Sequence, residues 1–256
     1  MLTREQQVRD ILLMPIENIS LMPVKCNIKE PIKICICDNT IYSSKKYYKY
    51  NAFDPDMSDF AVEFYQIIYK KMLKEQEHEI LKGHILKNKE FCGDTMNSYK
   101  TIAKKIEDPK KKEKLKKRYH CLANFWLLPM HVGHSSPWTN ILGLGKYSKS
   151  QPRSLDDYMD RFIKYYLQEY KQYLKIYPDY ARKFTPDNFG LNHFIDGIYV
   201  NNNEVMKFSD KEADDIVIDM CNKIEERANR IACEKGTELY DFFSKLRIIG
   251  STAKSI

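Results

Sequence analysis

Apolar residues recur at helical spacing over residues 54–72 and 154–178. The first stretch opens on Asp54-Pro55, a cap residue followed by the proline that is favoured at the first helical position. The second opens on Ser154 and Asp157, which approximate a capping box. Each stretch predicts a helix with one apolar face turned inward.

Further helices are predicted over residues 93–119 and from Ser209 onward. The first region divides at Asp108-Pro109, because proline disfavours the helical conformation in the residue before it. A capping box at Ser209 opens a helix that the pattern ends at Gly236, where a last helix follows.

Two short β-hairpins are also predicted. Residues 33–37 alternate polar and apolar side chains before Asp38-Asn39, and three asparagines, residues 201–203, separate two short apolar runs. Residues 121–129 are the most apolar run and predict a buried element. We predict a mainly α fold, a single helical domain (residues 1–256) with one or two short β-hairpins; the helical core is residues 51–256, and residues 1–50 show little pattern beyond the first hairpin.

Composition narrows the class of protein. No run approaches the roughly 20 apolar residues that a bilayer crossing needs, so no membrane span is expected. The first ten residues carry charges of both signs and lack the features of a signal peptide. Seven cysteines without a framework spacing favour free thiols in a reducing compartment. A cytoplasmic protein is expected.

Most of the net charge of +7 lies in residues 104–118, which hold nine basic residues against three acids. Lysines bind phosphates by releasing counterions, whereas the plain alternative is a solvated helix face. Two tryptophans follow this basic segment. The candidate binding residues here are Lys111, Lys112, Lys114, Lys117, Arg118, Trp126 and Trp138.

A second candidate site lies in the segment FCGDTMNSY, residues 91–99. Asp94 and Asn97 offer hydrogen bonds at the start of a predicted helix, where free backbone N–H groups attract anions. The plain alternative is a cluster of N-cap residues.

Three histidines form the candidate metal site. His120, His131 and His134 lie within 15 residues of one another, the last two in a long loop rich in Gly, Ser and Pro, residues 130–153. Neutral imidazole is a common ligand of divalent metals, but CxxC pairs are lacking, and loop packing is the alternative. The sequence has no phosphate loop, GxGxxG, GxSxG or HExxH motif.

The order of segments resembles an uncharacterised family of low-GC Gram-positive bacteria and their mobile elements, a family with no known activity. The resemblance covers roughly residues 50–208. Its counterparts here are DPDMSDFAVEFY, CGDTMNSY, LANFWLLP, DYMDRFIKYYLQEY and LNHFIDGIYV.

The run HCLANFWLLP is similar to a segment of HNH-type nuclease domains. This resemblance places His120 and Asn124 on that motif's histidine and asparagine, and implies a divalent metal that supports phosphodiester cleavage. The upstream aspartate-histidine pair of those nucleases has no counterpart, and His134 better matches the downstream asparagine position. His120, Asn124 and His134 are thus the candidate catalytic residues.

Two functions follow as hypotheses. The favoured one is binding of a nucleic acid, nucleotide or protein partner through the basic segment and the adjacent His/Trp loop. The alternative is a metal-dependent phosphodiesterase or nuclease, of degenerate HNH type, in phage defence or counter-defence.

Overall fold

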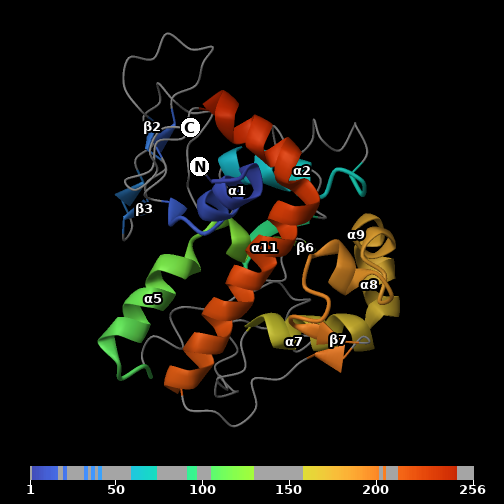
Figure 1. The fold of residues 1–256 in the computed structure, drawn as a ribbon. Coiled ribbons are helices and arrows are strands. Elements are labelled where there is room, and N and C mark those ends of the chain that lie inside the picture. The colour runs from blue at the N-terminus through green and yellow to red at the C-terminus, as the bar shows by residue number, and fades with distance from the viewer. Residues whose placement is uncertain are drawn as a thin grey trace.

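The computed structural model describes residues 2–16, 20–21, 32–33, 36–37, 40–41, 59–73, 91–96, 105–129, 158–201, 204–205 and 213–246. Most of these are helical, which confirms the mainly α prediction (Figure 1). The helices are α1 (Arg4–Leu12), α2 (Asp59–Ile68), α5 (Pro109–Tyr119), the 3-10 turn η4 (Leu122–Asn124), α7 (Tyr158–Gln168), α8 (Tyr170–Ile176), α9 (Pro178–Lys183), α10 (Phe189–Asn192) and α11 (Ala213–Leu246).

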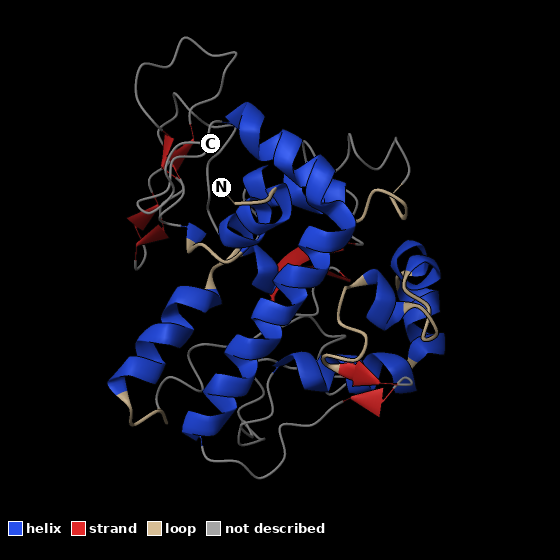
Figure 2. Ribbon diagram, in the orientation of Figure 1, coloured by secondary structure: helices blue, strands red, loops and turns tan. Residues whose placement is uncertain are grey.

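The strands pair two by two and antiparallel (Figure 2). The pairs are β1 (Ser20–Leu21) with β2 (Ile32–Lys33), β3 (Ile36–Cys37) with β4 (Thr40–Ile41), β5 (Phe91–Thr95) with β6 (Phe125–Pro129), and β7 (Val200–Asn201) with β8 (Glu204–Val205). The β3–β4 and β7–β8 pairs confirm the two predicted hairpins. The β1–β2 and β5–β6 pairs were not predicted.

Helix α11 packs against α1, α2, α5 and η4. It runs the length of the molecule in Figure 1, with α5 beside its first half and α1 and α2 beside its second half. The ring of Phe60 on α2 stacks on Phe242 of α11 with centroids 5.7 Å apart. The buried hydrophobic side chains of these helices belong to one core cluster.

The sequence pattern is wrong about the end of this helix. Gly236 lies inside α11, which continues for ten more residues to Leu246. A Cβ built on Gly236 would meet Cγ of Glu5 on α1 at 3.5 Å, an ordinary contact. Packing against α1 therefore carries the helix through a residue that, by propensity alone, favours a stop.

The strand pair β5–β6 corrects a second prediction. Residues 93–95 were expected to begin a helix, but they lie in β5, where Gly93 pairs with Leu127 and Asp94 with Trp126. Every residue of β6 is buried, so its continuous apolar run is that of a strand covered on both faces. The tertiary partner decides the conformation of β5, which the local sequence does not.

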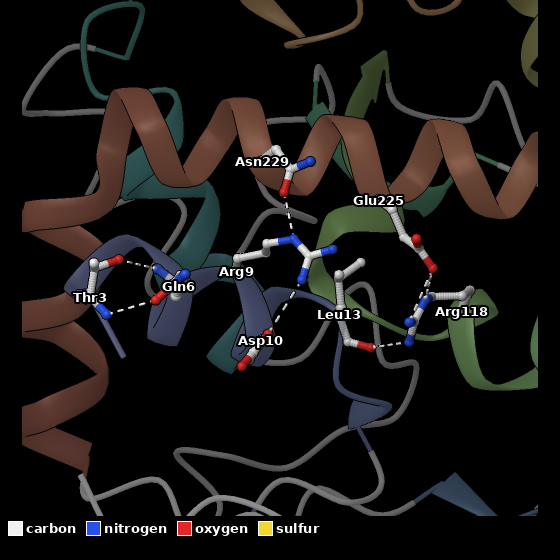
Figure 3. Close-up of polar contacts among 8 residues, drawn as sticks. All are labelled: Thr3, Gln6, Arg9, Asp10, Leu13, Arg118, Glu225 and Asn229. Carbon is white, nitrogen blue, oxygen red and sulfur yellow. Dashed lines mark hydrogen bonds and ion pairs between the residues drawn. The ribbon is translucent and has the colours of Figure 1, made fainter. Parts of the chain in front are cut away.

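Helix α1 was missed within the first 50 residues, although its capping box is present. Thr3 Oγ1 accepts from the N–H of Gln6 at 3.2 Å, and Gln6 Oε1 accepts from the N–H of Thr3 at 2.9 Å (Figure 3). Val8, Ile11 and Leu12 are buried. The T-x-x-Q signature was thus readable.

The predicted helix over residues 154–178 is divided. Helix α7 ends at Gln168, α8 begins at Tyr170, and α9 starts with Pro178 at its first position. Tyr170 donates from its hydroxyl to the carbonyl of Ala181 at 3.0 Å, which holds α9 against the preceding helices. No helix among the described residues has the length and apolar character needed to cross a membrane.

Candidate nucleic-acid interface

Helix α5 carries most of the excess positive charge of the chain. It holds seven basic residues and one acid in a chain of formal net charge +7. Asp108 is its N-cap, with Oδ1 accepting from the N–H of Lys110 at 2.8 Å, and Pro109 takes the first helical position. These residues end the preceding segment where the sequence predicted a break and fix the start of the helix.

One face of α5 packs against the start of α11. Leu115 is fully buried, and Nζ of Lys111 lies 3.6 Å from Oδ2 of Asp214. The Asp214 carboxylate also accepts from the backbone N–H groups of Glu107 at 3.1 Å and Asp108 at 3.3 Å. The entry into α5 is thus joined to the first turn of α11.

Arg118 joins the other end of α5 to α11 and to the segment after α1. Its Nη2 and Nε both lie 3.2 Å from Oε1 of Glu225, and its Nη1 donates to the carbonyl of Leu13 at 3.0 Å (Figure 3). In the same view Arg9 of α1 donates to Asn229 of α11. Because both of its ends are anchored, α5 presents its exposed side in a fixed orientation.

Lysines line the exposed side of α5, next to the face that packs on α11. Lys110, Lys114 and Lys117 are exposed and follow one another at spacings of four and three residues, so they lie in line along the helix. We call these three residues the lysine stripe. Lys112 and Lys116, also exposed, flank it. None of these five side chains takes part in the anchoring contacts described above.

The predicted binding residues on α5 therefore fall into two groups. Lys112, Lys114 and Lys117 are exposed, whereas Lys111 and Arg118 are ion-paired with acids of α11. An arginine that is held by a carboxylate and a carbonyl oxygen anchors the helix rather than contacts a ligand.

Glu113 is the one acidic side chain on α5. Its Oε1 lies 3.9 Å from Nζ of Lys117, and both side chains are more than half exposed, at 56% and 61%. An exposed pair of this kind contributes about 0–1 kcal/mol, so it is easily exchanged for another partner.

Trp126 does not lie on this surface, which corrects the expectation that its ring serves binding. Its side chain is fully buried in β6, edge-on to Phe162 at 5.5 Å and to His193 at 5.4 Å between ring centroids. A ligand on the molecular surface cannot reach it.

His120 and Asn124, the predicted catalytic pair, lie just after α5. The ring of His120 packs on Tyr119 with centroids 4.2 Å apart, and its carbonyl accepts from the N–H of Ile16 at 2.8 Å. Asn124 is fully buried, and its Nδ2 donates to the carbonyl of Tyr119 at 2.8 Å. His120 thus joins the end of α5 to Ile16, and Asn124 joins it to the segment that leads into β6.

Other predicted site residues fall outside the described part of the chain. These are Asn97, His131, His134 and Trp138, and of Asp94 only the backbone is described. Among the residues that the structure describes, no three His, Cys, Asp or Glu side chains lie close enough together to hold a metal ion. The proposed ligand set of His120, His131 and His134 stays a prediction.

A buried polar centre at His193 was missed by the sequence reading. Nδ1 of His193 lies 3.0 Å from the hydroxyl of Tyr69, and Nε2 lies 3.1 Å from that of Tyr180. Tyr180 donates its proton to the carbonyl of Leu127 at 3.1 Å, so its oxygen accepts from Nε2–H. In a neutral His193 this places the proton on Nε2 and leaves Nδ1 to accept from Tyr69.

Arg227 of α11 lies beside this histidine and is fully buried. Its Nε donates to the carbonyl of His193 at 2.9 Å, and its Nη1 donates to those of Ala123 at 2.6 Å and Phe125 at 2.8 Å. Burial, and after it the positive charge of Arg227, holds the pKa of His193 well below its ordinary value. Burial also lowers the pKa of Arg227.

The sequence did contain a signal for Arg227. It lies three residues after Ile224 and four before Ile231, which is the spacing of the buried face of α11. A basic residue at an apolar position indicates a buried partner set, here the backbone carbonyl oxygens of His193, Ala123 and Phe125.

Comparison of the chain with protein-family models, with curated proteins and with solved structures finds no match. Both resemblances stated from the sequence therefore stay predictions.

Proposed function

We propose that the protein binds nucleic acid through the phosphate groups that face the lysine stripe of α5. The observation that carries the proposal is that the side chains that anchor this helix are different from the lysines that it exposes. Leu115, Lys111 and Arg118 hold it in place, while the exposed lysines are left for a ligand. Each lysine that meets a phosphate releases a counterion, which is the main source of affinity for nucleic acids at low salt.

The shape and chemistry of this surface favour a polyanion over a single nucleotide or a protein partner. A single nucleotide is usually held in a concave pocket, whereas the stripe consists of exposed side chains in line along one helix. Protein interfaces depend on buried aromatic, aliphatic or arginine anchors, and the exposed side chains of α5 are five lysines, one glutamate and Pro109. An extended row of phosphates complements such a face directly.

Fluorescence anisotropy with short labelled oligonucleotides, both duplex and single-stranded, tests the proposal at about 50 and 200 mM NaCl. The decisive variant replaces all three residues of the lysine stripe by glutamine. The matched control replaces Lys164, Lys171 and Lys175, exposed lysines of α7 and α8, and so removes the same charge elsewhere.

The wild-type chain is expected to bind at about 50 mM salt, and the stripe variant to bind at least about ten-fold more weakly, with the control close to wild type. Far-UV circular dichroism verifies that both variants keep their helices. The proposal is overturned if the wild-type chain binds neither oligonucleotide at low salt, or if the control loses as much affinity as the stripe variant.

A further inference from the structure

Resting on that proposed function, we propose that the ligand is a nucleic-acid duplex, bound by its backbone without regard to base sequence. The residues of the stripe, the residues it lacks and its dimensions each support this.

The first observation is that the exposed face of α5 has no planar Arg, Asn or Gln side chain, the kind that pairs with a base edge through two fixed hydrogen bonds. The exposed positions of α5 offer lysines instead, and a lysine can contact guanine, but its compact ammonium on a flexible stem pairs equally well with any phosphate. The one arginine of the helix, Arg118, is engaged with Glu225 and the carbonyl of Leu13. Phosphate contacts alone position a protein on its ligand but carry no sequence information.

The second observation is that the described residues offer no ring on this face for a single strand to stack on. Single-stranded ligands are held by stacking of bases on exposed aromatic side chains, each worth about 1–3 kcal/mol. The ring at the end of α5, Tyr119, is half-buried and packs on His120. Trp126, the nearest tryptophan in the sequence, is in the core.

The third observation concerns length and charge density. The stripe runs from Lys110 to Lys117, eight residues of helix, which is a rise of about 10.5 Å from first to last. A duplex carries one charge per about 1.7 Å of its axis, twice the axial density of one of its strands. A rigid row of lysines therefore meets more charge on a duplex, and without the entropy cost of straightening a flexible strand.

The stripe supplies about three phosphate contacts, which fixes the expected salt dependence. For a duplex the slope of log Kobs against log salt is about −0.9 per contact, hence about −2.7 here, and the affinity drops about 40-fold between 50 and 200 mM. A stripe variant that keeps its fold loses most of this slope.

Replacing Glu113 is expected to tighten binding, an effect that misfolding of the variant would not produce. Its carboxylate lies beside Lys117 on the exposed side of α5, where it repels phosphate and competes for the lysine. Glu113→Gln is expected to tighten duplex binding by about three-fold or more at 50 mM salt, because it removes a like charge from the contact.

The experiment measures the wild-type chain, the stripe variant and Glu113→Gln against four labelled probes of equal length: a DNA duplex, the same duplex with scrambled sequence, an RNA duplex and the single DNA strand. We expect the two DNA duplexes to agree within about two-fold and both to bind at least about five-fold more tightly than the single strand. Comparison of the RNA duplex with the DNA duplex shows which of the two backbones the chain binds more tightly.

Each contrary outcome has a distinct meaning. Equal or tighter binding of the single strand, or strong preference for one duplex sequence, overturns the duplex inference and leaves the proposed function in place. A duplex slope twice as steep as expected overturns the three-contact count. Absence of binding to all four probes overturns the proposed function itself.

Discussion

Replacing Gly236 by alanine tests whether α11 continues through this residue, as in the structure, or ends there, as the sequence pattern predicts. In the structure Gly236 is an interior residue of α11, and an added Cβ would make only an ordinary contact with Glu5. Alanine in a helix interior is about 0.8–1 kcal/mol more favourable than glycine. Gly236→Ala is therefore expected to stabilise the protein by about 1 kcal/mol.

The matched control is Gly197→Ala. Gly197 has a φ of +68°, a left-handed conformation that alanine adopts only at a cost of about 1–2 kcal/mol. Space is not the reason for this cost, since a Cβ at Gly197 would meet nothing within 4 Å. The same chemical change is thus expected to act in opposite directions at the two sites.

Urea unfolding followed by circular dichroism at 222 nm measures both variants, and thermal unfolding should show a rise of about 2–4 °C for Gly236→Ala. If α11 instead ended at Gly236 in a left-handed cap, alanine there would destabilise the protein as it does at Gly197. A loss of stability in Gly236→Ala would therefore refute the continuous helix.

Three further predictions concern the interior. Because the pKa of His193 lies below its value of about 6.5 in an unfolded chain, the unfolded state alone takes up a proton as the pH falls through 6.5. Wild-type stability should then drop by up to about 1.4 kcal/mol per pH unit relative to His193→Gln, measured by urea unfolding between pH 7.5 and 5.5; parallel curves would contradict this. Arg227→Met leaves three buried carbonyls without their donor and should cost about 3 kcal/mol or more in the same assay, so unchanged stability would count against the network. Leu115→Ala should cost about 2–3 kcal/mol and speed hydrogen exchange in α5 before α11; equal acceleration in both helices would mean that α5 is not a separately anchored element.

The features that the sequence predicted are those with local causes. The start of α5 depends on Asp108 and Pro109, which lie next to it, and strands β3 and β4 are only two residues apart along the chain. The basic character of the candidate site was likewise visible in one contiguous segment.

The features that the sequence missed depend on partners far along the chain. Strand β5 exists because β6 pairs with it, and Gly236 stays helical because α1 packs beside it. Which lysines of α5 are exposed could not be predicted before Asp214 and Glu225 were known to take Lys111 and Arg118. The burial of Trp126 follows from the same dependence on tertiary structure.

The pairing of α1 with α11 has a consequence for how the chain is synthesised. The hydrogen bond between Arg9 and Asn229 joins residues 220 positions apart. At a translation rate of about 5–20 residues per second, α1 leaves the ribosome some ten seconds or more before its partner exists. Its apolar side chains Val8, Ile11 and Leu12 lack their partner helix for that time, so the N-terminal segment completes its packing only near the end of synthesis.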